Sequence, residues 1–187
     1  MTVYSIIGAG IIGSSIAREI RRKDLGEVVV LEKEHELGYH ASGRNSGVIH
    51  SGINQQPGTY KAEMCVKGSR MLRNYCKEMG VPMLECGTLV IGRNDREKEI
   101  LHELRIMGKR VGVPGLRIIN QEELVEKEPN ANGLVALLSP TGAIVDSKNL
   151  LKTVAREAEN LGATYMFDAP VEKILGTEII TRGNSLK

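Results

Sequence analysis

The first stretch of the chain alternates short apolar runs with a segment of helical periodicity. The apolar run Val3–Ile7 is short enough for a buried parallel strand. After it, Ile12, Ile16 and Ile20 recur at four-residue intervals, which predicts an amphipathic helix. A second apolar run at 28–31 predicts another buried strand. The order of strand, helix and strand is typical of a parallel α/β sheet.

Similar periodicities continue along the rest of the chain. They predict helices at 59–79, 95–111, 121–128 and 148–161, and strands at 86–92, 134–138, 164–167, 171–175 and 178–182. In the helix at 59–79, a stripe that includes Met64, Met71 and Met79 is expected to form core. The strand at 86–92 has few neighbours in the predicted pattern, so we expect it to find little sheet within this chain.

Residues 33–58 interrupt this regular pattern. The segment is rich in Gly, Ser, Asn and His, and a long irregular segment inside a compact domain is usually functional. Small residues such as Ser42, Gly43 and Gly47 would let the backbone lie against a flat ligand. The patterns on either side predict a Rossmann-like α/β domain built from 1–51 and 146–187. Residues 52–145 would then be an insert, the start of a substrate domain.

Glycines with special spacing stand between the first predicted strand and helix. Gly8 would allow the tight turn, Gly10 would let the backbone approach a pyrophosphate, and Gly13 would let the helix pack closely on the strand. Glu32, at the end of the second strand, is placed to accept hydrogen bonds from ribose hydroxyls. Together these residues predict a dinucleotide site, and the acidic Glu32 argues against the 2′-phosphate of NADP.

Composition narrows the possible functions. The chain has 187 residues, of which 41% are apolar, so it is globular. Its net charge of +2 argues neither for nor against a charged partner, whereas its aromatic content of 3% argues against a base-stacking nucleic-acid surface. Three cysteines without a C-x-x-C pair suggest reduced thiols in a cytoplasmic protein and no metal site. We expect no signal peptide, because the N-terminus starts a strand, and no transmembrane segment, because no apolar run reaches ~20 residues.

The irregular segment also carries a recognisable pattern. Residues 44–52 read R-N-S-G-V-I-H-S-G, and the spacing P-G-x-x-K-A-x-x-C-V-x-G follows. This run resembles the L-2-hydroxyglutarate dehydrogenase/oxidase family, within the wider group of FAD-dependent amino-acid oxidases and glycerol-3-phosphate dehydrogenases. The N-terminal G-A-G-I-I-G and the run G-A-I-V-D-S-K-N-L-L at 142–151 resemble the same group.

The resemblance implies FAD rather than NAD as cofactor, and a Rossmann-like FAD-binding domain with an inserted, incomplete substrate-domain region. It implies contacts to the pyrophosphate, the adenosine ribose, the diphosphate and flavin, and the adenine. The residues implied are Gly8, Gly10, Ile11, Ile12, Gly13, Glu32, Lys33, Ala41, Ser42, Gly47, Val48 and Val171.

The resemblance further implies a dehydrogenase or oxidase that takes a hydride from a small 2-hydroxy acid. His50 would fall near the flavin, and its imidazole is the candidate acceptor of the substrate hydroxyl proton. The alternative is a loop histidine that packs against cofactor or backbone. Arg44 could pair with a substrate carboxylate or the flavin diphosphate, or be a surface arginine, while His35 and His40 are interpreted as surface residues.

Two departures from the family pattern shape the remaining expectations. Residues 54–56 are Asn-Gln-Gln where the family usually has aromatic residues, so oxidation of glycerol 3-phosphate or an amino acid stays an alternative. Family members are about twice this long, so the chain alone is expected to be an incomplete enzyme, or a non-catalytic nucleotide-binding subunit. We expect a homo-oligomer or a second chain that completes the site. The expected location is the cytoplasm, with peripheral membrane association as the alternative.

Overall fold

The computed structural model describes residues 2–182 and 184–186. The chain forms two compact units, of which the first contains Met1–Ser46 and Asp146–Lys187 and the second contains Gly47–Val145. The sequence predicted that the first segment of this unit ends at residue 51, later than the Ser46 found in the structure. The irregular segment at 33–58 is therefore shared between the two units, which are described separately below.

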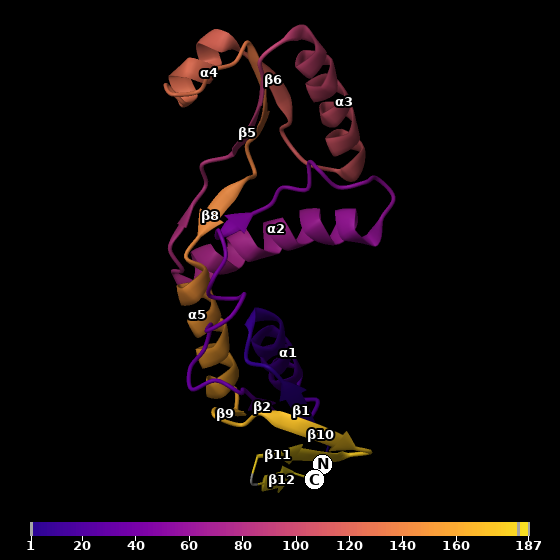
Figure 1. The fold of residues 1–187 in the computed structure, drawn as a ribbon, viewed down its shortest axis with the longest axis vertical. Helices are drawn as coiled ribbons and strands as arrows, with labels where there is room; N and C mark the ends of the chain where they lie inside the picture. The colour runs from indigo at the N-terminus through magenta and orange to yellow at the C-terminus, as the bar shows by residue number, and fades with distance from the viewer. Residues whose placement is uncertain (1, 183, 187) are drawn as a thin grey trace. The chain divides into compact units, whose positions relative to one another are not determined.

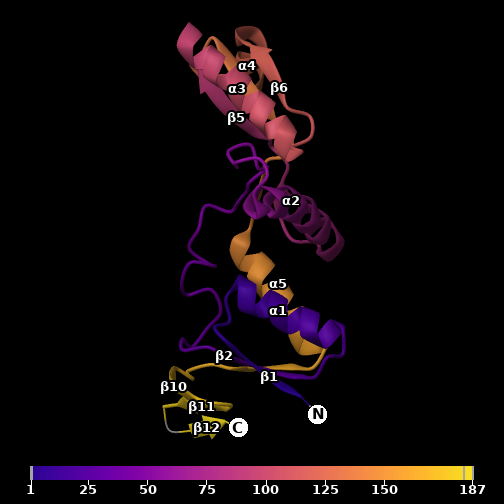
Figure 2. The ribbon, with the colours of Figure 1, turned by 90° about the vertical axis from the view of Figure 1, so that its right-hand side faces the viewer.

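The first unit is built on a three-stranded parallel sheet in the order β1-β2-β9. Its strands are β1 (Val3–Ile7), β2 (Glu27–Leu31) and β9 (Ala163–Met166). The helices α1 (Ile11–Arg22) and α5 (Ser147–Asn160) lie side by side and contact the sheet (Figures 1 and 2). Small side chains, among them Ala17, Ala158 and Ala163, form the core between these elements, which explains how closely they approach. The α/β class predicted from the sequence is confirmed.

The prediction that the first strand is buried was wrong. Val3 is 49% exposed and Ile7 is 53% exposed, because β1 is the edge strand of its sheet. The isoleucines of α1 are exposed as well, with Ile12 at 74% and Ile16 at 47%. This helix buries Ser14 and Ala17 instead. An apolar surface therefore runs along β1 and α1 of this unit.

A small antiparallel sheet completes the first unit. It contains β10 (Val171–Leu175), β11 (Glu178–Thr181) and β12 (Asn184–Leu186), in that order. Ile179 of β11 packs with Leu31 and Ala169 in a small buried cluster. Strand β10 therefore begins close to the end of β2, where the sequence places Glu32.

The second unit contains two antiparallel sheets. One has the order β3-β8-β4, with β3 (Val48–Ile49), β8 (Ala143–Val145) and β4 (Met83–Leu84). The other has the order β5-β7-β6, with β5 (Thr88–Gly92), β7 (Val135–Ser139) and β6 (Arg117–Asn120). The expectation that the strand at 86–92 finds little sheet was wrong, because β5 pairs along its whole length with β7. Strands β3, β4, β6 and β8 have two to four residues each, too few to show a periodicity in the sequence.

Three helices belong to the second unit: α2 (Tyr60–Met79), α3 (Asp95–Val111) and α4 (Gln121–Lys127). Of the apolar stripe expected in α2, Cys76 is buried, whereas Met71 is 59% and Met79 is 43% exposed. The buried residues of α2 are Ala62, Ser69 and Cys76. Met64 and Met71 stand two positions after Ala62 and Ser69, which is roughly 200° around a helix, and Met79 stands three positions after Cys76. The small side chains Ala62, Ser69 and Cys76, rather than the methionines, therefore face the rest of the unit.

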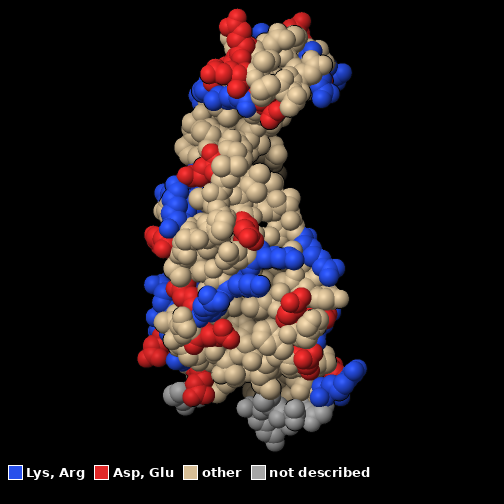
Figure 3. Space-filling view, turned by 90° about the vertical axis from the view of Figure 1, so that its left-hand side faces the viewer, with Lys and Arg blue, Asp and Glu red and all other residues tan. Residues whose placement is uncertain are grey.

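The surface carries both signs of charge. Lys and Arg side chains are interspersed with Asp and Glu on the face drawn in Figure 3, in keeping with the small net charge of +2. None of the helices in the described part of the chain is long and apolar enough to cross a membrane.

Candidate nucleotide-binding site

The turn between β1 and α1 depends on two glycines. Gly8 has a φ of 99°, a conformation that is strained for residues with a Cβ atom, and its N–H donates to the carbonyl oxygen of Leu31 at 2.7 Å. A Cβ atom on Gly13 would collide with the carbonyl oxygen of Gly8. The first turn of α1 therefore rests directly on the end of β1.

The amino end of α1 is not capped by a side chain of its own. The helices α2, α3, α4 and α5 begin after Thr59, Asn94, Asn120 and Asp146, whose side-chain oxygens accept a backbone N–H. Helix α1 begins after Gly10, which has no side chain to do so. Instead, the Ile11 N–H donates to Ser42 Oγ at 3.0 Å. A helix end with no capping side chain of its own and a positive dipole suits an anionic group such as a diphosphate.

Gly10 makes the close approach between the turn and the 41–43 loop possible. A Cβ atom at this position would lie 2.9 Å from Ser42 Oγ, closer than van der Waals contact allows. The same space lies in front of the amino end of α1. A side chain at residue 10 would therefore displace Ser42 from this position. That Gly10 lets the backbone approach a pyrophosphate stays a prediction.

Glu32 links the second strand to the glycine turn. Its Oε2 accepts the Ala9 N–H at 2.8 Å, and its Oε1 accepts the Glu34 N–H at 3.0 Å. The carboxylate thus holds the turn in place, a role that the sequence did not indicate. Each carboxylate oxygen can accept a further hydrogen bond, so Glu32 can hold the turn and still accept from a ribose hydroxyl.

Two adjoining cavities of the first unit, of about 160 Å³ and 340 Å³, share Glu32 and His40 in their walls. Most of the cofactor residues expected from the sequence and assigned to this unit line one or both: Gly8, Gly10, Glu32, Lys33, Ala41, Ser42 and Val171. Ile11, Ile12 and Gly13 line neither, and Ile12 points to solvent. We call the seven lining residues the nucleotide cradle.

Sequence reasoning missed His40 as a lining residue. His40 Nε2 lies 2.7 Å from Glu34 Oε1, and this hydrogen bond holds the pKa of the Glu34 carboxyl below its ordinary value. Although His40 is exposed, the pairing places its ring beside both cavities. Tyr39, Ala169 and Pro170 also line them, and the last two could have been found as the residues directly before Val171.

The Arg44 side chain contacts an aromatic ring. Its guanidinium carbon lies 4.7 Å from the centroid of the Tyr39 ring, a cation–π contact. Because Tyr39 lines the smaller cavity, Arg44 is held near the nucleotide cradle.

The remaining predicted residues belong to the second unit. Val48 lies in β3, where it pairs with Ile144 of β8. The Gly47 carbonyl accepts the Val145 N–H at 2.8 Å. His50 follows β3 and is exposed, and its backbone carbonyl accepts the thiol of Cys65 at 3.6 Å. Burial raises the pKa of Cys65, which keeps the thiol protonated and able to donate. The main chain at His50 is thereby fixed to α2, while its ring is available to solvent.

The sequence of this chain is similar to those of known proteins. Residues 4–185 match the family described as FAD dependent oxidoreductase. The chain is 39% identical over 170 residues to the human mitochondrial L-2-hydroxyglutarate dehydrogenase, covering 90% of this chain and 37% of that protein. It is 36% identical over 183 residues to the glycerol 3-phosphate dehydrogenase of Caloramator mitchellensis, covering 95% and 38%. The chain thus spans less than half the length of these relatives.

The solved structures that it resembles show the same partial coverage. The L-α-glycerophosphate oxidase of Mycoplasma pneumoniae, solved with FAD bound, superposes with a TM-score of 0.84 at 26% identity, over 97% of this chain and 50% of that one. The L-proline dehydrogenase of P. horikoshii superposes with a TM-score of 0.85 at 23% identity, which is evidence for the fold alone.

Proposed function

The chain belongs to the FAD dependent oxidoreductase family, and on that premise we propose that it is the FAD-binding part of an enzyme that oxidises a small 2-hydroxy acid. The observation that carries the proposal is the nucleotide cradle, in which the glycine turn, the uncapped end of α1 and Glu32 converge. L-2-Hydroxyglutarate is the substrate we favour, because several relatives are L-2-hydroxyglutarate dehydrogenases.

Within the cradle, each group of residues has a distinct task. The amides at the start of α1, with Gly10 and Ser42, would hold the diphosphate. Glu32 would accept from the adenosine ribose, with Lys33 beside it, and the backbone of Val171 would meet the adenine. Ile11, Ile12 and Gly13 would contact the pyrophosphate through their main-chain atoms. Gly47 and Val48 would follow the diphosphate toward the flavin. Bound FAD would supply the acceptor for a hydride from the hydroxyl-bearing carbon.

The chain's own contribution to the reaction would be proton transfer and orientation. We propose that the His50 imidazole accepts the substrate hydroxyl proton, because its main chain is held by Cys65 while the residue is exposed, and imidazole is the side chain that most often acts as a general base. For Arg44 we propose a role toward a carboxylate or the diphosphate. Its contact with Tyr39 would limit the conformations of the guanidinium and so prepare it for an oxyanion.

Flavin binding and reduction together test the proposal. We expect purified chain to retain FAD, seen as visible flavin absorption after gel filtration, and not NAD. In the complete protein, isolated from its own cells, L-2-hydroxyglutarate should bleach this absorption under anaerobic conditions. Failure to retain FAD would refute the cofactor assignment. Bleaching by glycerol 3-phosphate or an amino acid instead would favour the alternative substrates, for which one relative is a glycerol 3-phosphate dehydrogenase. Flavin that no substrate bleaches would favour a non-catalytic subunit.

Self-association, or assembly with a second chain, is also expected. The exposed edge of β1 and the exposed Ile12 and Ile16 of α1 form an apolar surface that a partner would cover. Light scattering should therefore give a mass above that of one chain, and Ile16→Lys should shift it toward the monomer. Ile106→Lys, in α3 of the other unit, is the matched control, since Ile106 is 50% exposed. A monodisperse monomer that oxidises L-2-hydroxyglutarate or glycerol 3-phosphate would contradict the expected association. It would also contradict the expectation that the chain alone is an incomplete enzyme.

The cellular location of the protein belongs to the proposal as well. The names of several relatives place those proteins in mitochondria. The cytoplasmic location expected from the sequence stays a prediction for this chain, as does peripheral membrane association.

A further inference from the structure

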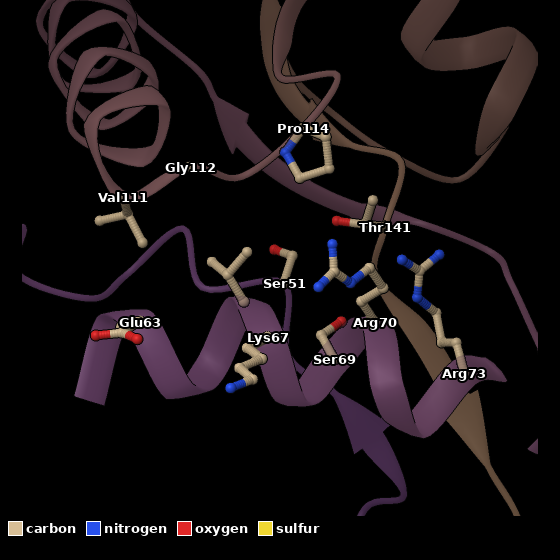
Figure 4. A pocket seen from close by; sticks show the side chains of 11 residues that line it. Ser51, Glu63, Lys67, Ser69, Arg70, Arg73, Val111, Gly112, Pro114 and Thr141 are labelled. Atoms are coloured by element: carbon tan, nitrogen blue, oxygen red, sulfur yellow. The ribbon is translucent and has the colours of Figure 1, made fainter. Parts of the chain in front are cut away.

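A cavity of about 440 Å³ lies within the second unit, and none of its lining residues belongs to the nucleotide cradle. One wall is α2, and the opposite wall is formed by the carboxyl end of α3, the loop that follows it and the turn at Thr141 (Figure 4). Its volume is within the range of sites that hold small organic molecules, roughly 300–1,000 Å³. The lining combines apolar side chains such as Val66, Val111 and Pro114 with several polar ones.

Three polar side-chain atoms of the lining are buried without a hydrogen-bond partner. Ser69 is only 6% exposed, and its hydroxyl makes no hydrogen bond. Arg73 Nε and Thr141 Oγ1 are buried and unpaired in the same way, and both residues line the same cavity. A buried polar atom without a partner costs free energy, so such groups are rare in folded proteins. Three of them in one cavity indicate a ligand that supplies hydrogen-bond acceptors.

The charges of the cavity favour an anionic ligand. Figure 4 shows the Arg70 and Arg73 side chains extending from α2 toward Thr141, whereas the Lys67 ammonium points away. Arg73 Nη1 is paired with Glu85 at 3.0 Å, which leaves its Nε for another acceptor. Glu63 lines the cavity as well, so its lining cations, Lys67, Arg70 and Arg73, outnumber its one acid.

We propose that this cavity binds a small organic anion through a carboxylate or phosphate group. The oxyanion would accept hydrogen bonds from Arg70, Arg73 Nε and the hydroxyls of Ser69 and Thr141, since guanidinium groups match planar oxyanions. The apolar part of the ligand would lie against Val66 and Val111. The site shares no residue with the nucleotide cradle, so the proposal is independent of the flavin.

The test uses the full chain with glutarate and inorganic phosphate as probes and sodium chloride at matched ionic strength as the reference. Calorimetry should show saturable binding, and the ligand should raise the unfolding temperature. Arg70→Gln should raise the dissociation constant roughly tenfold or more, the scale of a lost charge-assisted hydrogen bond. The matched control is Arg96→Gln in α3, an exposed arginine outside the cavity, which should leave binding unchanged.

Ser69→Ala separates ligand binding from folding. Because the Ser69 hydroxyl is unpaired in the free chain, its removal should leave the unfolding temperature without ligand unchanged or higher. The same variant should bind the probe several-fold more weakly. Binding of glutarate alone would identify a carboxylate site, and binding of phosphate alone a phosphate site. No saturable binding of either probe, or equal affinity in wild type, Arg70→Gln and Ser69→Ala, would overturn the proposal, whether or not the chain retains FAD.

Discussion

Gly10→Val is expected to weaken FAD binding severely while the chain keeps its fold. The new side chain would enter the crevice between the turn and the 41–43 loop, where even a Cβ atom lies 2.9 Å from Ser42 Oγ. It would displace Ser42 from the Ile11 N–H and fill the space in front of α1. Overpacking costs about 1–3 kcal/mol and a lost hydrogen bond about 1 kcal/mol, so affinity should fall by roughly 30- to 1,000-fold.

The fold should survive this change, because Gly10 has a φ of −74°, which any residue adopts, and Ser42 can rotate aside. Fluorescence titration with FAD measures the affinity, and circular dichroism with thermal unfolding measures the fold. Gly68→Val in α2 is the matched control, because nothing lies within 4 Å of its Cβ position. Undiminished FAD affinity in the folded Gly10→Val variant would show that the cradle is not the diphosphate site.

The largest effect on catalysis is expected from His50→Ala. If His50 accepts the substrate hydroxyl proton, its removal should slow flavin reduction by roughly 10²–10⁴ while FAD stays bound. Cofactor retention should be unaffected, because the cradle residues of the first unit are unchanged. The main chain should also be preserved, since Cys65 bonds the His50 carbonyl and not its ring.

Rapid mixing of the complete, active protein with L-2-hydroxyglutarate measures this step directly. Loss of the imidazole should also change the shape of the pH–rate profile, because a general base must be deprotonated to act. His102→Ala, in α3 of the same unit, serves as the comparison and should leave the rate unchanged. A His50→Ala rate within a few-fold of wild type would make His50 a structural loop histidine.

Much of the fold could be predicted because it depends on local signals. The strand, glycine turn, helix and second strand at the amino terminus need only short-range information, namely apolar runs and the absence of side chains at Gly8 and Gly13. The boundaries of α3, predicted as 95–111, agree with the structure for the same reason. Asparagine before the helix and glycine after it mark both ends, and the structure has Asn94 and Gly112 at those caps.

Burial was predicted less well, because a periodic pattern identifies an apolar face but not what covers it. Val3–Ile7 is apolar enough for a central strand, yet its position at the edge of the order β1-β2-β9 leaves it exposed. In α2 the methionines look like core, but the side that packs inward carries Ala62, Ser69 and Cys76. The length and charge of α2 gave no sign that one buried serine would lie unpaired in a cavity.

For the candidate site, the sequence was enough to predict Gly8, Gly10 and Glu32 as dinucleotide residues, since that prediction depends only on backbone geometry and a fixed distance along the chain. Only the tertiary structure brought Ser42 to the start of α1, Val171 to the end of β2 and His40 beside both cavities. Those contacts join segments distant in sequence, and their formation depends on how loop 33–46 folds back over the sheet. Spacing along a chain cannot encode that path, because it is selected by the packing of all the elements together.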